Sequence, residues 1–109
     1  MEPKQYQLLL AIKGLPEDVN PTISILAERL HIRHHSTVEL INRAEANDFV
    51  KRVREGNFVH VELTRKGERI LARAVEKRLR QLQTAGPVLV KALKALTHNH
   101  SGKIKGKRS

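Results

Sequence analysis

The sequence predicts a mainly α-helical fold with one small β-hairpin, of the α+β class, organised as a single domain. Apolar residues recur at helical spacing over most of the chain. In residues 49–63 the pattern changes to β-branched residues that roughly alternate with polar ones, around a central Gly56. The length of 109 residues and the hydrophobic fraction of 39% suffice for one modest core. We therefore expect a domain over residues 1–97, followed by a basic, flexible tail over residues 98–109.

Two helices are predicted near the N-terminus. Apolar residues at near-helical spacing predict the first over residues 4–13, and Gly14 ends it. A polar loop follows over residues 15–21. Ser24 is the expected N-cap of the second helix, which ends near Leu30 and is apolar along one face.

A third helix is predicted over residues 34–47, after a three-residue break at 31–33. Its apolar residues follow an i, i+3, i+4, i+7 pattern, which is typical of a helix with one buried face. They are Thr37, Leu40, Ile41 and Ala44. The third helix must pack across the second, so a small residue is needed where they approach, and Ala27 is expected there.

The next segment is predicted to be a two-stranded hairpin over residues 50–63. Glu55-Gly56-Asn57 is its tight-turn signal. Two short helices joined by a three-residue turn and followed at once by a hairpin constitute a winged helix-turn-helix arrangement, in which the hairpin is the wing.

The C-terminal third predicts two further helices. Thr64 is the expected N-cap of a helix over residues 65–84. Gly86-Pro87 is expected to end it and to begin another helix over residues 87–97, because Pro suits the first helical position. Their apolar residues either complete the core of one chain or form an interface between two chains. We favour C-terminal dimerisation helices in a homodimer, because a domain of this size has little left for two amphipathic helices to cover. The expected interface residues are Val75, Leu79, Leu82, Leu89, Leu93 and Leu96.

The outward face of the third helix is polar and rich in hydrogen-bonding groups. The major groove of B-DNA is wide enough for one helix, so this face is suited to base edges and phosphates. The candidate DNA-binding residues of this helix are His34, His35, Ser36, Val38, Glu39, Asn42 and Arg43. The hairpin adds Lys51, Arg52 and Arg54, which we expect to contact phosphates.

The charge of the chain supports a polyanionic partner. Lys and Arg total 21 against 11 acidic residues, which gives a formal net charge of +10. Nucleic-acid affinity comes largely from neutralising phosphates and releasing counterions, so a chain this basic favours a nucleic-acid partner over a merely solvated surface.

Individual residues of the third helix leave alternatives open. Arg43 could contact a phosphate or a base, or it could pair with Glu39 or Asn47 along its own helix. Glu39 lowers affinity where it faces phosphates, unless it accepts a hydrogen bond from a cytosine amino group. Asn42 is the better candidate for a base contact, since its amide can pair bidentately with adenine.

The histidines suggest a metal site as an alternative. His31, His34 and His35 lie close together, and His98 lies near His100. No HExxH pattern and no cysteine accompany them, so we expect neither a metal nor a cofactor. We interpret the cluster of His31, His34 and His35 as facing phosphates or bases. The basic tail over residues 98–109 either follows the DNA backbone or extends into solvent.

Other function classes are excluded by composition and pattern. Without cysteine there is no disulfide scaffold or thiol nucleophile, and with 3% aromatics a base-stacking single-strand binder is disfavoured. A nucleophile with a positioned base, paired carboxylates and a phosphate-binding Gly loop are all missing, so we expect no enzyme. No apolar run is long enough for a transmembrane helix, and no signal pattern opens the chain, so we expect a cytoplasmic protein.

Three segments stand in order over about half of the chain. They are Thr-Ile-Ser-Ile-Leu-Ala-Glu-Arg-Leu at 22–30, His-His-Ser-Thr-Val-Glu-Leu-Ile-Asn-Arg-Ala-Glu-Ala at 34–46 and Val-Glu-Leu-Thr-Arg-Lys-Gly-Glu at 61–68. Together they resemble the DNA-binding core of the multiple-antibiotic-resistance regulator (MarR) family of bacterial transcription factors.

The resemblance implies a homodimer that binds a pseudo-palindromic operator in double-stranded DNA, with helix 34–47 in the major groove and the terminal helices at the dimer interface. It also allows for a small-molecule effector of aromatic or phenolic type, although the sequence names no pocket residue for it. His31 and Asp48 stand where the family often has Gly in turns, and Asp tolerates left-handed backbone better than His.

A rival hypothesis is a winged-helix module for protein–protein interaction without specific DNA binding. The short wing and Glu39 favour the rival, whereas the net charge and the polar helix face favour a sequence-specific transcriptional regulator. A salt-dependent shift of random duplex DNA would separate the two hypotheses.

Overall fold

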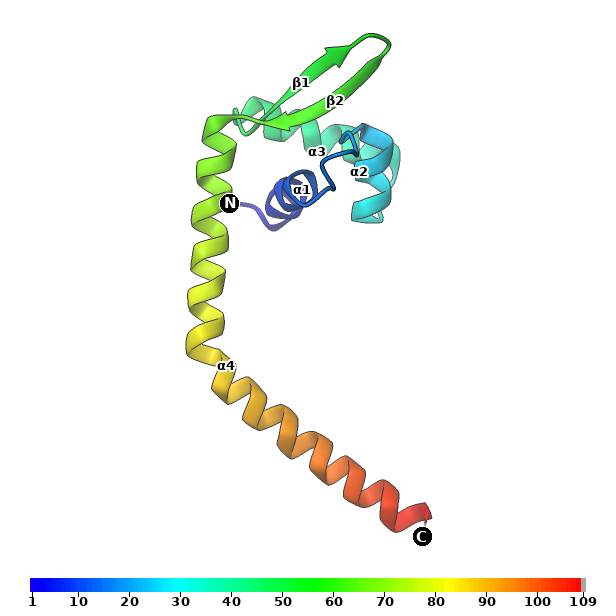
Figure 1. Cartoon of the computed structure of the whole chain (residues 1–109), viewed down its shortest axis with the longest axis vertical. Coiled ribbons are helices and arrows are strands. Elements are labelled where there is room, and N and C mark those ends of the chain that lie inside the picture. The colour runs from blue at the N-terminus through cyan, green and yellow to red at the C-terminus, as the bar shows by residue number, and fades with distance from the viewer. Residues whose placement is uncertain (109) are drawn as a thin grey trace. The chain divides into compact units, whose positions relative to one another are not determined.

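The computed structural model describes the backbone of residues 1–108 and the side chains of residues 1–97. In chain order, the elements are α1 (Pro3–Lys13), α2 (Ile23–Leu30), α3 (His34–Ala46), β1 (Val50–Glu55), β2 (Phe58–Leu63) and α4 (Arg65–Arg108) (Figure 1). The chain divides into two compact units, Met1–Ala74 and Val75–Ser109. The predicted class, mainly α-helical with one small hairpin, is confirmed.

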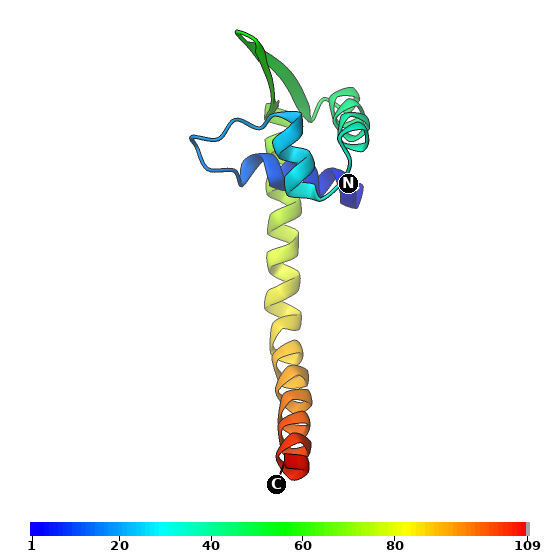
Figure 2. The same ribbon diagram turned by 90° about the vertical axis from the view of Figure 1, so that its right-hand side faces the viewer.

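The core of the first unit lies between three helices and the hairpin. α1, α2 and α3 contact one another, α1 also contacts β2, and α3 contacts β1. The loop between α1 and α2 stands away from this packed centre (Figure 2). The largest fully buried apolar side chains are Leu8, Leu9, Leu26, Ile41, Val50 and Val61. Each contributes roughly 1.5–3 kcal/mol of hydrophobic stabilisation, so this small set accounts for much of the stability of the unit.

The start of α2 differs from the sequence prediction. Thr22, not Ser24, is the N-cap, and its hydroxyl accepts a hydrogen bond from the backbone N–H of Ile25 at 3.3 Å. The helix therefore begins two residues earlier than Ser24 would allow. Just before the cap, the carbonyl of Pro21 accepts a hydrogen bond from the N–H of Val61 at 2.9 Å, which ties this end of α2 to the wing strand β2.

Two left-handed residues set the turns on either side of α3. His31 has φ 55° and Asp48 has φ 62°, and these are the two turn positions at which the resembled family often has Gly. At the first turn, the N–H of His31 donates to the carbonyl of Glu28 at 3.2 Å, which closes the last turn of α2. After this short turn α3 contacts α2, and Ala27 is one of the buried residues of α2.

The hairpin pairs in the register that its tight turn dictates. Val50 lies opposite Leu63, and Glu55 lies opposite Phe58, so two residues form the turn between the strands. Gly56 is one of them and has φ 59°, a conformation that costs Gly little and other residues more. The predicted hairpin and its turn are confirmed.

Thr64 joins the wing, the end of α3 and the start of α4. Its hydroxyl accepts a hydrogen bond from the N–H of Gly67 at 2.9 Å and donates one to the carbonyl of Asp48 at 2.5 Å. Its own N–H donates to the carbonyl of Phe49 at 3.0 Å. Glu68 lies in the first helical turn, where the helix dipole favours a carboxylate. The predicted capping role of Thr64 is confirmed.

The predicted break at Gly86-Pro87 is wrong, because α4 continues through both residues to Arg108. Pro87 removes one backbone hydrogen bond but does not have to end a helix. Much of the steric conflict before a proline comes from the Cβ of the preceding residue, and Gly86 has none. The two expected helices, 65–84 and 87–97, are therefore parts of a single one.

The predicted flexible tail, residues 98–109, lies outside the part of the chain whose side chains the structure describes. Within the described residues, no helix is both long enough and apolar enough to cross a membrane.

Gly67 provides a test of the packing between the wing and α4. A Cβ at this buried position would lie 2.0 Å from the carbonyl oxygen of Phe49, which is backbone and cannot rotate away. We expect Gly67→Ala to lower the free energy of unfolding by about 2–3 kcal/mol, the upper range for overpacking. Urea denaturation followed by circular dichroism measures this change.

Arg69→Ala is the control, because Arg69 is exposed on the same helix and Ala favours the helical conformation. It should change the free energy of unfolding by less than about 1 kcal/mol. Equal effects of the two substitutions would contradict the close approach at Gly67.

Candidate nucleic-acid interface

One side of α3 is exposed because the opposite side is buried in the core. Thr37, Leu40, Ile41 and Ala44 are buried, as the sequence pattern predicted. The structure leaves most of the candidate residues on the opposite side accessible. His34, His35, Glu39, Asn42 and Arg43 are exposed, and Ser36 and Val38 are half-buried. The helix thus presents a mostly polar side, and most of its side chains are accessible.

Two polar contacts accompany the apolar stripe of α3. Asn47, the C-cap residue, donates a hydrogen bond from Nδ2 to Oε1 of the buried Gln5 on α1 at 3.5 Å. The hydroxyl of Thr37 donates to the carbonyl of Arg33 at 2.9 Å, which satisfies a fully buried polar group. The Asn47 contact joins the end of α3 to α1, whereas the Thr37 contact lies within α3 and its N-cap.

Arg43 pairs with a residue that was not predicted. Its Nη2 lies 3.4 Å from Oε1 of Glu2, so the proposed pairing with Glu39 or Asn47 along the helix is replaced by a contact with the segment before α1. Both side chains are about half exposed, and such pairs contribute little to stability. The guanidinium can therefore exchange its partner for a phosphate at small cost.

The three basic residues of β1 do not share one environment. Lys51 and Arg54 are exposed and make no hydrogen bond or ion pair with any described residue. Arg52 is only 29% exposed at its side chain. Its Nη1 contacts Oε1 of Glu45, and its Nη2 donates to Oδ1 of Asn42 at 2.8 Å. Arg52 is thus directed at α3 rather than at solvent.

Glu45 is a site residue that sequence reasoning did not identify. It follows Asn42 by three residues, a spacing that places two side chains on the same side of a helix. That spacing was available from the sequence. The approach of Arg52 from β1 was not, because it depends on how the left-handed turn at Asp48 returns the chain along α3.

The histidines His34 and His35 are exposed at the N-terminal end of α3. Among residues 1–97, no group of three or more His, Asp and Glu side chains is arranged to hold a metal ion. His98 and His100 lie outside the described side chains.

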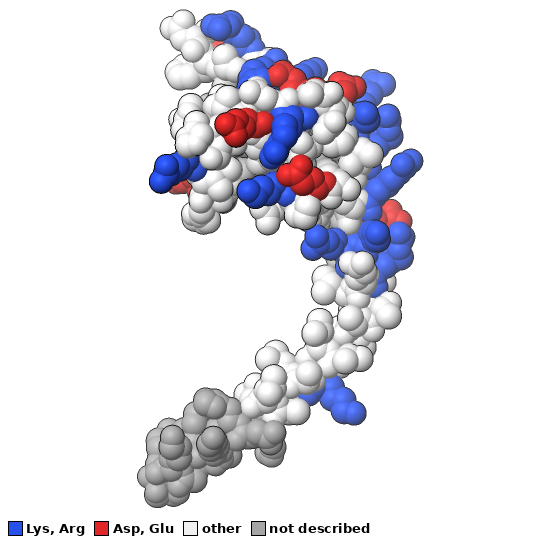
Figure 3. Space-filling model, turned by 180° about the vertical axis from the view of Figure 1, so that it is seen from behind, with Lys and Arg blue, Asp and Glu red and all other residues white. Residues whose placement is uncertain are grey.

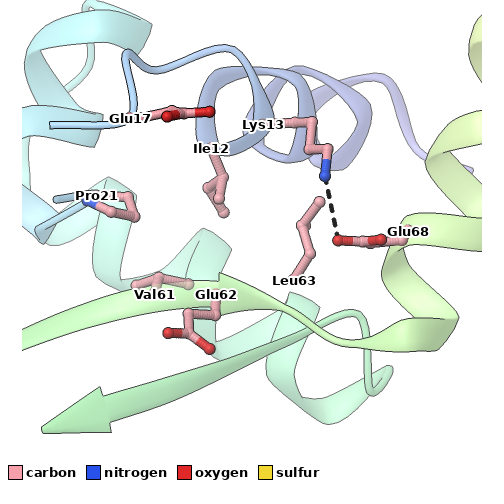
Figure 4. A pocket seen from close by; sticks show the side chains of 8 residues that line it. All are labelled: Ile12, Lys13, Glu17, Pro21, Val61, Glu62, Leu63 and Glu68. Atoms are coloured by element: carbon pink, nitrogen blue, oxygen red, sulfur yellow. Dashed lines mark hydrogen bonds and ion pairs between the residues drawn. The ribbon is translucent and has the colours of Figure 1, made fainter. Parts of the chain in front are cut away.

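A pocket of about 440 Å³ lies between the end of α1, the following loop, β2 and the first turn of α4 (Figure 4). Lys13 and Glu68 form an ion pair at its edge, with Nζ and Oε1 3.2 Å apart. Glu17 and Glu62 also line the pocket, so carboxylates outnumber the single ammonium. This charge favours a neutral or cationic small molecule over an anion.

Basic side chains gather over the first turns of α4 as well as on the wing (Figure 3). Arg65, Lys66, Arg69 and Arg73 are all exposed there. Further along the helix, residues 81–90 contain no charged residue. The described part of the second unit therefore exposes an apolar side, which includes Leu79, Leu82, Leu89, Leu93 and Leu96.

Comparisons with known proteins agree on one family. The model of the MarR family matches residues 1–57. A MarR family protein from Bacillus stearothermophilus is 28% identical, with a TM-score of 0.70, over 93% of this chain and 76% of that one. FabT from Streptococcus pneumoniae, solved in complex with DNA, is 19% identical, with a TM-score of 0.63. The match covers 96% of this chain and 77% of FabT. MosR from Mycobacterium tuberculosis, also solved with DNA, is 22% identical, with a TM-score of 0.64. The match covers 94% of this chain and 79% of MosR. The search of curated proteins finds no match.

Glu39 provides a test of whether the exposed face of α3 approaches phosphates. Its carboxylate is exposed and has no partner among the described residues. We expect Glu39→Gln to raise the affinity for random duplex DNA about two- to fivefold, because an exposed like charge is worth up to about 1 kcal/mol. Fluorescence anisotropy at several salt concentrations measures the change. An unchanged affinity for random duplex, with preference lost at one G·C pair, would instead assign Glu39 to a cytosine contact.

Proposed function

The chain belongs to the MarR family, and we propose that it is a transcriptional regulator that binds double-stranded DNA sequence-specifically as a homodimer. The observation that carries the proposal is the exposed polar face of α3, held by a buried stripe and flanked by a basic wing. A chain with a net charge of +10 supplies the attraction to phosphates that such binding needs.

The dimensions of α3 suit the major groove. From His35 to Asn42 the helix rises roughly 10 Å, at 1.5 Å per residue. The major groove is about 12 Å wide and presents a distinct pattern of donors and acceptors for each base pair. Exposed side chains along these two turns can therefore contact neighbouring base pairs while α1 and α2 stay outside the groove.

The wing is proposed to position the protein on the backbone. Lys51 and Arg54 project from β1 without an internal partner, which leaves both free to neutralise phosphates. The turn between β1 and β2 has only two residues, so we assign the wing contacts to strand side chains rather than to a long tip. Contacts of this kind set the register and carry little sequence information.

The homodimer is proposed to form along the apolar side of α4. The six expected interface residues are separated by 4, 3, 7, 4 and 3 positions, which is the a/d spacing of a coiled-coil seam. Gly86 occupies the one seam position between Leu82 and Leu89 that is not apolar and large. Because α4 is continuous, this seam is continuous too. A second chain would cover the seam and place two copies of α3 on one face of DNA, about 34 Å apart.

A small-molecule effector, where one acts, is proposed to fit the pocket beside the Lys13–Glu68 ion pair. Ligand binding there would act on β2 and on the first turn of α4 together. The carboxylates of this pocket favour a neutral or cationic effector over a phenolic acid.

The proposal is tested first by selecting duplexes from a random pool. The intact chain should enrich a pseudo-palindromic sequence, and its affinity for that sequence should fall with salt. We expect His35→Ala together with Asn42→Ala to lose about 1–3 kcal/mol of discrimination per base contact, with the fold intact by circular dichroism. An unchanged preference in the double variant would remove α3 from the major groove.

The dimer is tested by a charge placed in the seam. Leu93→Glu should convert the dimer to monomer, because a buried unpaired carboxylate at an interface is costly. Val88→Glu is the matched control, since Val88 is 68% exposed against 65% for Leu93 but lies outside the a/d positions. Sedimentation equilibrium at tens of micromolar protein distinguishes dimer from monomer for the parent chain and for both variants. A monomeric parent chain would contradict the homodimer, and a dimer that survives Leu93→Glu would place its interface elsewhere.

A further inference from the structure

We propose that Arg52 is a positioning residue for base recognition, which holds the amide of Asn42 in the one orientation that Asn42 uses toward DNA. This inference rests on the proposed function and deepens it. It departs from the expectation that Arg52 contacts a phosphate, and the contacts of Arg52 with α3 are the reason.

The orientation of the Asn42 amide follows from the chemistry of its partner. A guanidinium carries only hydrogen-bond donors, so the Asn42 atom that faces Nη2 of Arg52 at 2.8 Å must be the oxygen. The Nδ2 group is then directed away from Arg52. An exposed asparagine without such a partner rotates broadly about its last torsion and populates both orientations of its amide.

The guanidinium is itself held from two sides. Glu45 binds Nη1 while Asn42 accepts from Nη2, so the planar group is fixed between two residues one helical turn apart. The backbone of Arg52 lies within β1, opposite the fully buried Val61 on β2. The orientation of Asn42 is therefore fixed by the sheet and not by α3 alone.

The held amide keeps the groups that a base contact requires. Nδ2 is available as a donor, and Oδ1 retains a second lone pair after accepting from Arg52. This combination matches the N7 acceptor and the amino donor of adenine in the major groove. A side chain that is already oriented loses less conformational entropy when it binds.

The charges separate Arg52 from a phosphate contact. The carboxylate of Glu45 neutralises the guanidinium of Arg52, so this residue adds little to the attraction of phosphates. Arg54, two positions along the same strand, has no described partner and keeps its full charge for the DNA backbone. Arg52 and Arg54 thus form a matched pair for experiment.

The experiment compares Arg52→Met, Arg54→Met, Asn42→Ala and the double variant Arg52→Met/Asn42→Ala with the parent chain. Dissociation constants are measured for the selected duplex and for every single-base change in one half-site, at several salt concentrations. Arg52→Met should lower the preference about tenfold at the one base pair whose preference Asn42→Ala abolishes, and leave the other positions unchanged. The double variant Arg52→Met/Asn42→Ala should lose no more base preference than Asn42→Ala alone, because the two residues act as a unit.

The salt dependence gives the second readout. Arg54→Met should reduce the slope of log K against log salt by about one without changing any base preference. Arg52→Met should leave that slope nearly unchanged. A uniform loss of affinity over all sequences with a slope reduced by one would overturn the inference and make Arg52 a phosphate contact.

Arg52→Lys covers the case in which Arg52→Met fails to fold. Lysine keeps the charge but lacks the planar fork that reaches Asn42 and Glu45 together, so the same base preference should fall while the slope is retained. A parent chain that selects no sequence would refute the proposed function and this inference with it. A parent chain that selects a sequence, with preferences unchanged in Arg52→Met and Arg52→Lys, would refute the positioning role alone.

Discussion

The burial of one stripe of α3 is the constraint on which the rest of the structure depends. Thr37, Leu40, Ile41 and Ala44 lie against the other helices and β1, and a helix that buries one side must expose the other. The polar face is therefore a consequence of core packing. A change in the core that rotated α3 would alter the candidate interface without touching any residue on it.

The wing is joined to the helices through two kinds of contact. At its base, Thr64 connects the end of β2 to the turn after α3 and to the first turn of α4. Along its first strand, Arg52 connects β1 to the exposed side of α3. Because Arg52 contacts α3 directly, β1 and the exposed side of α3 form one surface. The charges on this surface are only partly paired. Glu45 offsets Arg52, whereas Glu39 has no described partner.

The second unit shows how a local signal can be misleading. Gly and Pro in sequence are a strong signal for the end of a helix, and Gly86-Pro87 carries this signal. The same glycine removes the Cβ that would obstruct a helix just before proline, so the pair is compatible with a continuous α4. Continuity supports the proposed homodimer, because it brings the apolar residues on either side of the pair into one seam.

The sequence by itself determined the presence and order of the helices of the first unit, although not the start of α2. It also determined the hairpin with its Gly56 turn, the cap at Thr64 and the buried stripe of α3. Each of these depends on periodicity or on turn chemistry over a few residues, which a sequence displays directly. It also determined which side of α3 is polar. The exposure of His35 and Asn42 follows from the same periodicity.

Only the tertiary structure decided the partners of the charged side chains. Arg43 pairs with Glu2 and Arg52 with Glu45, and each pair joins two different parts of the chain. Such contacts depend on where α1 begins and on how the turn at Asp48 directs β1, and small differences in backbone direction move a long side chain by several ångströms. The sequence therefore determined which surface is available, and the packing of separate elements decided which of its residues are free to bind.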